Sequence, residues 1–136
     1  MDKSDEVLST LVECFTGLDD YECRSHLDFS EKRPAPIMVI VALDNFQQVN
    51  VGLDDYKMHF NVLIDSLISD DLNGEGFTAA VKAVCKKAEE ISDRDYDLTN
   101  TFKDLPVVAC FYTGANRNLT QDSNRCIVGI DVITSE

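Results

Sequence analysis

Apolar and polar residues alternate with a period of two between residues 54 and 68. The apolar members are Tyr56, Met58, Phe60, Val62 and Ile64. The intervening residues are polar, with Leu63 as the apolar exception. Successive side chains of an extended strand point to opposite faces, so this pattern predicts a long strand with one buried face and one exposed face.

Two other stretches have the spacing of amphipathic helices. The first covers residues 4–16 and carries the apolar residues Val7, Leu8, Leu11, Val12 and Phe15. The second covers residues 77–91 and carries the stripe Phe77, Val81, Val84, Cys85, Ala88 and Ile91. Residues three and four apart share one side of a helix, so each stretch predicts a helix with one apolar face.

Further strands are predicted on both sides of the second helix. The β-branched run Ile37–Leu43 is typical of a central strand covered on both faces, and Asp44–Gly52 is predicted as a polar hairpin connection. Val107–Tyr112 and Cys126–Thr134 are predicted as a final strand pair. The polar segment between them, Thr113–Arg125, is predicted as a long loop, either a plain surface loop or one that projects from the sheet as a contact arm.

Several adjacent strands combined with only two helices favour antiparallel pairing. A short strand is also compatible with the alternation around Tyr21 and Cys23. We therefore predict an α+β fold with a mainly antiparallel sheet of four to five strands and two helices packed on one face. The chain of 136 residues is expected to form a single domain over residues 1–136.

Charge and hydropathy exclude several classes of function. The chain has 25 acidic and 12 basic residues and a net charge of −13, which repels nucleic-acid phosphates, so we expect no sequence-specific nucleic-acid binding. The longest apolar run, Ile37–Leu43, is far shorter than the roughly 20 residues of a membrane helix. The N-terminal residues lack the basic and apolar regions of a secretory signal, so a cytoplasmic site of synthesis and residence is expected.

The candidate chemistry is sparse. The five cysteines form no C-x-x-C pair, and their positions inside predicted elements favour buried thiols over disulfides or a zinc site. Of the two histidines, His59 lies on the polar side of the long strand, and no Ser–His–Asp or Cys–His arrangement can be proposed. We predict no enzyme, no cofactor and no metal site. An enzyme would need a site assembled from Asp and Tyr side chains.

The order of elements resembles the tail terminator, or tail completion, proteins of long-tailed bacteriophages and prophages. The resemblance covers residues 4–133 and depends on an N-terminal amphipathic helix and a proline-led apolar strand at Pro34–Ile40. It also depends on the long strand, the Asp71-Leu72-Asn73-Gly74 turn with the helix after it, and a terminal hairpin. No single short motif carries it.

This resemblance implies a non-enzymatic protein of the virion tail, assembled in the bacterial host cytoplasm. Its partners would be further copies of itself in a ring, commonly a hexamer, and the tail tube or head–tail connector proteins. The ring would cap the tail tube, stop its growth and join it to the head. We expect the subunit contacts to include Arg117 and Arg125, facing acidic surface on a neighbour, and Leu63.

The exposed row of the long strand would then face solvent, a neighbouring subunit or the lumen of the ring. Its members are Lys57, His59, Asn61, Leu63 and Asp65. An alternative function is a small acidic cytoplasmic binding or adaptor module for a basic protein partner, because opposite charges favour association. The neighbouring genes would discriminate the two: tail tube and tape-measure genes in one case, toxin or signalling genes in the other.

Overall fold

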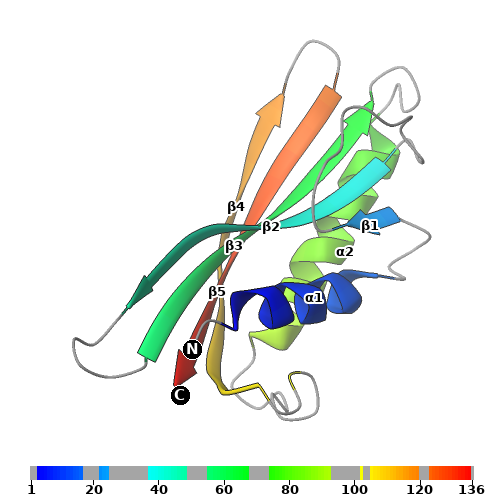
Figure 1. Ribbon diagram of the computed structural model, residues 1–136. Coiled ribbons are helices and arrows are strands. Elements are labelled where there is room, and N and C mark those ends of the chain that lie inside the picture. Colours follow the sequence, from blue (N-terminus) through cyan, green and yellow to red (C-terminus); the bar gives the residue numbers. More distant parts are fainter. Residues whose placement is uncertain are drawn as a thin grey trace, which may run out of the picture.

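Four long antiparallel strands form most of one open sheet, and two helices lie against it (Figure 1). A computed structural model of the protein describes residues 3–16, 22–24, 37–48, 55–67, 74–92, 102, 105–119 and 123–135. The elements are α1 (Ser4–Phe15), β1 (Glu22–Arg24), β2 (Ile37–Gln48), β3 (Asp55–Leu67), α2 (Glu75–Ile91), β4 (Val107–Leu119) and β5 (Ser123–Ser135). The strand order is β1-β2-β3-β5-β4, with β1 parallel to β2. The predicted α+β class is therefore confirmed.

The alternation along β3 produces the predicted two-faced strand. Met58, Phe60, Val62 and Ile64 are buried, and each pairs directly with a buried residue of β5. Those partners are Val132, Ile130, Val128 and Cys126. Because directly opposite residues in a ladder point to the same side of the sheet, these pairs form one continuous apolar face.

Both helices pack their apolar stripes on that face. From α1, Val7, Leu11 and Phe15 are fully buried at a spacing of four. The buried stripe of α2 consists of Phe77, Ala80, Val84, Ala88 and Ile91, while Val81 and Cys85 lie only partly buried beside the core. Full burial of a large apolar side chain contributes about 1.5–3 kcal/mol, so the two stripes hold the helices on the sheet.

Strand β2 is longer than the sequence pattern indicates. Met38–Val41 are buried, as predicted, but Ala42 and Leu43, which the prediction also placed in the covered part, are exposed, and the strand continues through Asp44 to Gln48. The expected hairpin connection at Asp44–Gly52 is therefore wrong for residues 44–48. A register shift between Leu43 and Asn45 interrupts the alternation, which explains why no strand pattern is visible there.

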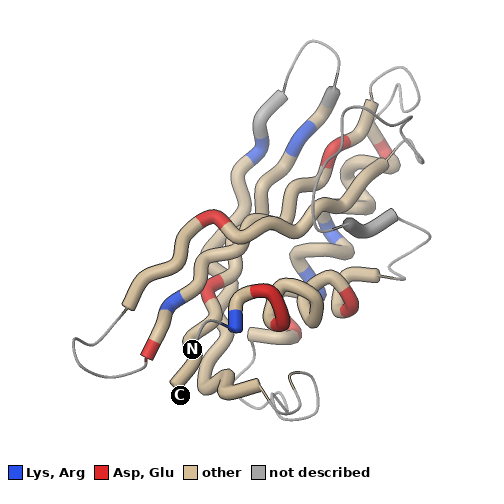
Figure 2. The backbone as a smooth tube through the Cα atoms, viewed as in Figure 1, with Lys and Arg blue, Asp and Glu red and all other residues tan. Residues whose placement is uncertain are grey.

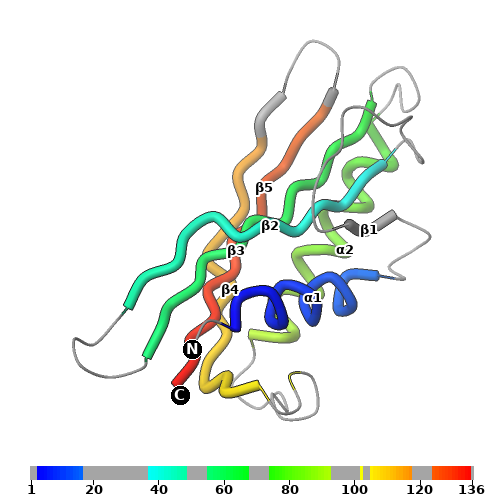
Figure 3. The backbone as a smooth tube through the Cα atoms, in the orientation of Figure 1, coloured from blue at the N-terminus to red at the C-terminus, as the bar shows by residue number. Residues whose placement is uncertain are grey.

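The predicted long loop Thr113–Arg125 is also wrong. Strand β4 runs to Leu119 and β5 begins at Ser123, so most of this polar segment is a paired hairpin. Strand β4 has two register shifts, and the one between Tyr112 and Gly114 separates its apolar and polar halves. In the backbone trace, β4 and β5 run together to one end of the sheet and β2 and β3 to the other (Figure 3).

Candidate functional site

The sheet face opposite the helices, here called the outer face, carries the polar side of β3. The residues of β3 on this face are mostly half-buried, whereas those on the helix side, apart from Tyr56, are buried. His59, Asn61 and Leu63 are half-buried. Asp65 is 3% exposed, so the expectation that it belongs to an exposed row is wrong. Neighbouring strands contribute side chains that cover these groups.

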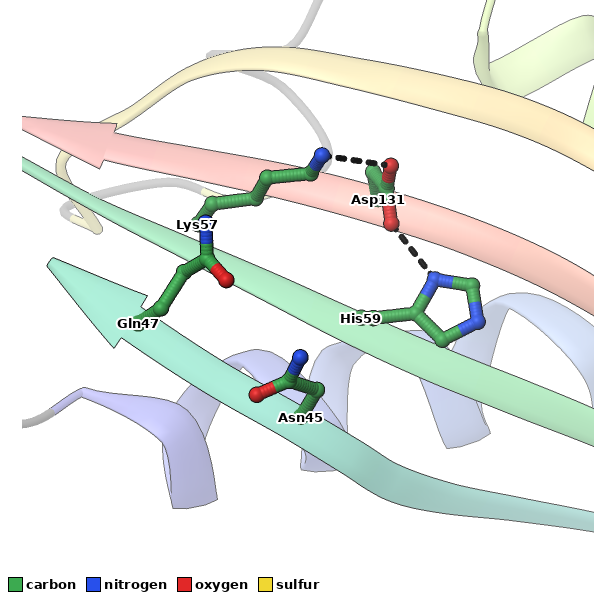
Figure 4. A pocket seen from close by; sticks show the side chains of 5 residues that line it. All are labelled: Asn45, Gln47, Lys57, His59 and Asp131. Atoms are coloured by element: carbon green, nitrogen blue, oxygen red, sulfur yellow. Dashed lines mark hydrogen bonds and ion pairs between the residues drawn. The ribbon is translucent and has the colours of Figure 1, made fainter. Parts of the chain in front are cut away.

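A polar cluster centred on Asp131 occupies part of the outer face (Figure 4). His59 and Asp131 are directly opposite in the β3–β5 ladder, and Nδ1 of His59 lies 2.5 Å from Oδ1 of Asp131. The amine of Lys57 lies 3.5 Å from Oδ2 of the same carboxylate, and Nε2 of His59 lies 3.1 Å from Oδ1 of Asn61. Both carboxylate oxygens are thus engaged by groups of β3.

The cluster borders a shallow depression of about 160 Å³. Its lining residues are Asn45, Gln47, Lys57, His59 and Asp131. Side chains of β3 thus engage the Asp131 carboxylate of β5, and the cluster links the two strands at and beside a directly paired position.

Gly129 provides the space for His59. A Cβ atom at position 129 would lie 2.2 Å from Oγ1 of Thr113 and 3.0 Å from Cε1 of His59. The first distance is too short for any side chain and the second is tighter than most real contacts, so glycine allows the imidazole of β3 and the hydroxyl of β4 to approach each other above β5. In the sequence, Gly129 occupies an ordinary polar-side position of the alternation of residues 126–132, which does not indicate what lies over it.

Asp65 and Arg125 form a second ion pair on the outer face. The two residues are directly opposite, and Nε of Arg125 lies 3.4 Å from Oδ1 of Asp65. The carboxylate is buried, while the Arg125 side chain is 39% exposed. Lys57 and Asp131 lie on the same face, and so does Asp55 at the start of β3, so the outer face of β3 and β5 carries two basic and three acidic described residues besides His59.

The three residues expected at subunit contacts lie on both faces of the sheet. Leu63 is directly opposite Ile127 on the outer face, near Arg125. Arg117 is directly opposite the buried Cys126 and therefore points to the helix side. There its guanidinium carbon lies 5.7 Å from the centre of the Phe77 ring. The sequence pattern did not single out Phe111 or Ile127, although both are large apolar residues exposed on the outer face.

Three thiols, those of Cys14, Cys110 and Cys126, are held in the protonated form by burial. Burial raises the pKa of the Cys110 thiol to about 12, and it also raises the pKa of Cys14 and of Cys126. Thiolate is the nucleophilic and metal-binding form, so these residues act as small apolar side chains. Cys110 and Cys126 are buried, as expected, whereas Cys14 and Cys85 are only partly buried; all four thiols are free.

The described residues provide neither a metal-binding cluster nor a membrane-spanning helix. Across the described ranges, no three His, Cys, Asp or Glu side chains come together in a way that could hold a metal ion. Neither of the two helices described here has the length and apolar character needed to cross a membrane.

Comparison with known proteins identifies the fold. No protein-family model matches the chain, and no curated protein matches it by sequence. Among solved structures, a chain from the virion of a native gene transfer agent (GTA) particle is similar, with a TM-score of 0.56 and 11% sequence identity. The match covers 93% of this chain and 84% of that chain. The whole α+β arrangement is therefore shared with a component of a virion particle.

Proposed function

We propose that the protein is a structural component of a phage-like virion, and specifically a tail terminator. In this proposal several copies form a ring, a hexamer as in the family it resembles, that caps the tail tube, stops its growth and joins it to the head. The observation that supports this most is the fold likeness to a chain of a gene transfer agent virion, which extends over 93% of this chain. The order of elements from residue 4 to residue 133 supports the same class.

The distribution of candidate contact residues is compatible with a ring. A closed ring needs two different surfaces on each subunit, so that contacts run head to tail. Leu63 and Arg125 lie on the outer face, whereas Arg117 lies on the helix side of the sheet. In this proposal the two arginines approach acidic surface on neighbouring subunits, and Arg125 keeps its pairing with Asp65 inside the chain.

The net charge of −13 also suits this role. Viral DNA passes through the junction of head and tail, and negative walls do not hold phosphates. The same charge argues against a function that depends on binding nucleic acid tightly.

Deletion of the gene from the phage or prophage that carries it tests the proposal. Electron microscopy of the resulting particles should show tails of uneven length that are not joined to heads, and the gene supplied in trans should restore uniform tails. In purified particles, an antibody against the chain should label the junction between head and tail. Tails of normal length joined to heads in the deletion strain would contradict the proposal.

A second candidate function has one specific observation in its favour. The solvent side of α1 carries the exposed acidic residues Asp5, Glu6 and Glu13, and Figure 2 shows acidic positions along this helix. Such a surface fits a basic protein partner by charge complementarity. Charge reversal at these three positions would abolish salt-sensitive binding to a basic partner in this case, and would leave tail assembly intact if the tail terminator proposal is correct.

A further inference from the structure

The sheet has two open edges within the described part of the chain, one on β4 and one on β2. Strand β4 is the last strand of the order β1-β2-β3-β5-β4, and β1 pairs with β2 only at Met38–Ile40. We propose that the rest of β2 in one copy of this chain pairs with β4 of a second copy, so that the sheet continues from subunit to subunit. The inference rests on the proposed ring and deepens it by naming the contact between its subunits.

The backbone of these edges calls for another strand. An edge strand directs N–H and C=O groups sideways, and a further strand satisfies such a row. Residues Ala42–Gln47 are all exposed, and in Figure 1 this end of β2 extends beyond both helices. Edges that stay single are commonly protected by charged side chains. Here Leu105–Asn116 contains no charged residue, and Ala42–Gln47 contains only Asp44.

Exposed apolar side chains gather on the same two edges. Five large apolar residues are exposed in the described ranges, and four of them belong to β2 and β4. These are Leu43 and Phe46 on β2, and Val108 and Phe111 on β4. Apolar side chains that gather at one place mark an interaction site, so both edges have the character of strands that become covered.

The strand directions fit a second copy at these edges. Each of the pairs β2–β3, β3–β5 and β5–β4 is antiparallel. Strands β2 and β4 therefore run in opposite directions. A second copy that is rotated about an axis parallel to the strands presents its β4 to β2 in the antiparallel sense, and the strict alternation of directions continues across the boundary.

The two edges also match in level along the strands. Asn45 is paired with His59, His59 with Asp131, and Asp131 with Phe111. The same path across the sheet leads from Gln47 to Ala109, through Lys57 and Ile133. The exposed end of β2 and the apolar half of β4 thus lie at one level, and both segments lie between the register shifts of their strands. A rotated copy needs no shift along the strands to bring Asn45 beside Phe111.

The covered part of β2 has its own counterpart on β4. Ile40, which β1 covers, is level with Asn116, through Leu63 and Ile127. At this level β4 is polar and exposed, with Asn116 and Arg117. Each level of the sheet therefore has either two open edges with apolar side chains, or a covered edge on β2 and a polar edge on β4. This correspondence is the observation that identifies a second copy as the occupant.

Charge is compatible with the same occupant. The net charge of −13 makes most approaches between copies repulsive. The contact described here brings the uncharged half of β4 to a segment with one carboxylate, so little repulsion opposes it. A basic partner would gain little attraction from the same two edges.

The contact is heterologous, because β2 and β4 are different edges of one sheet. One copy's β2 can pair with its neighbour while its own β4 accepts a third copy. Such contacts close into a ring or extend as a filament. This is the arrangement that the proposed ring requires.

Lysine substitutions test the inference by sedimentation equilibrium over a concentration series of the full chain. Phe46→Lys blocks the edge of β2, and Phe111→Lys blocks the edge of β4. Each changes the net charge from −13 to −12, so a loss of association cannot come from stronger repulsion. Each should weaken self-association by about 10-fold or more, as expected for loss of an aromatic anchor.

Ala115→Lys is the matched control, since it lies at an exposed position in the polar half of β4. It should associate as the original chain does. Far-UV circular dichroism and thermal unfolding verify that each variant is folded. If Phe46→Lys does not fold because it loses its stacking on Tyr56, Leu43→Lys blocks the same edge.

The equimolar mixture of the two variants separates the edges. The intact β2 of the Phe111→Lys chain can pair with the intact β4 of the Phe46→Lys chain, so the mixture should form a dimer that grows no further. A mixture that remains monomeric overturns the inference. So does a folded edge variant that associates like the original chain, or an original chain that stays monomeric up to roughly 1 mM, a concentration that detects even weak contacts.

Amide hydrogen exchange distinguishes strand pairing from contact between side chains alone. In the associated form, amides of residues 42–47 and 107–112 that are open in the monomer should exchange about 10-fold more slowly or better, because they become hydrogen-bonded. Association that leaves exchange in both segments unchanged overturns the inference.

These outcomes are separable from the tail terminator proposal. A chain that is monomeric in solution but labels the junction of head and tail would overturn the edge contact and leave the proposed function standing. A chain that assembles through the two edges, but whose deletion leaves tails normal, would do the reverse.

Discussion

Nε of Arg125 lies 3.4 Å from Oδ1 of Asp65, directly across the β3–β5 ladder. The carboxylate is almost fully buried, whereas the guanidinium side chain remains partly in solvent. Removing the cationic partner of a buried carboxylate lowers the free energy of unfolding by more than an exposed ion pair contributes to it. The reason is that the remaining charge lies in a medium that solvates it poorly.

The first prediction concerns this pair. Arg125→Met should lower the free energy of unfolding by about 1 kcal/mol, a value reduced by the solvent exposure of the arginine. Urea denaturation at neutral pH measures the change. In the background of Asp65→Asn the same substitution should cost clearly less, and equal costs in the two backgrounds would show that the pair does not interact.

The second prediction concerns the close approach over Gly129. Gly129→Ala should destabilise the protein by about 1–3 kcal/mol, since the new Cβ overlaps Oγ1 of Thr113 and crowds His59. Thr113→Ala in the same chain should recover part of this loss, measured again by urea denaturation. Gly114→Ala is the matched control. The backbone φ of +133° at Gly114 makes alanine unfavourable there, but no atom lies within 4 Å of the added Cβ, so the loss does not come from a steric clash. Thr113→Ala should not rescue it.

The third prediction concerns alkaline stability. The pKa of Cys110 is raised by burial to about 12 from an ordinary value of 9.0, so the folded state keeps its proton where the unfolded state releases it. The resulting stabilisation is fully present below about pH 9 and is lost as pH rises from 9 toward 12. The free energy of unfolding should therefore fall over this range, and Cys110→Ala should remove about 1 kcal/mol of that fall per pH unit. Identical slopes for the two proteins between pH 9 and 10.5 would contradict the prediction.

The fourth prediction concerns the contact between Arg117 and Phe77. The guanidinium carbon lies 5.7 Å from the ring centre, within the range of a cation–π interaction. Arg117→Ala should lower the free energy of unfolding by about 0.5–1 kcal/mol. Lys82→Ala, at an exposed position of α2, the helix that carries Phe77, should change the free energy of unfolding by much less. If both substitutions have the same effect, the arginine is only a solvated charge.

The register shifts explain where the sequence pattern predicted the strands incorrectly. Alternation is visible only while one face stays buried and the register stays constant. Both conditions hold along β3, whose predicted and observed bounds agree within a residue. They fail in β2 beyond Leu43, where both faces are exposed, and in β4 beyond Tyr112, where a second shift precedes a polar stretch. Polar residues in a paired hairpin therefore had the appearance of a loop.

The sequence by itself determined the acidic character of this protein and its local periodicities, namely two amphipathic helices and a two-faced central strand. These follow from spacing along the chain, which decides which side chains share a face. Only the tertiary structure decided which faces meet which. Strand pairing placed Asp65 beside Arg125, Asp131 beside His59, and Gly129 beneath His59 and Thr113. Those residues are far apart in sequence, and their proximity depends on the register of three strands, which no local pattern specifies.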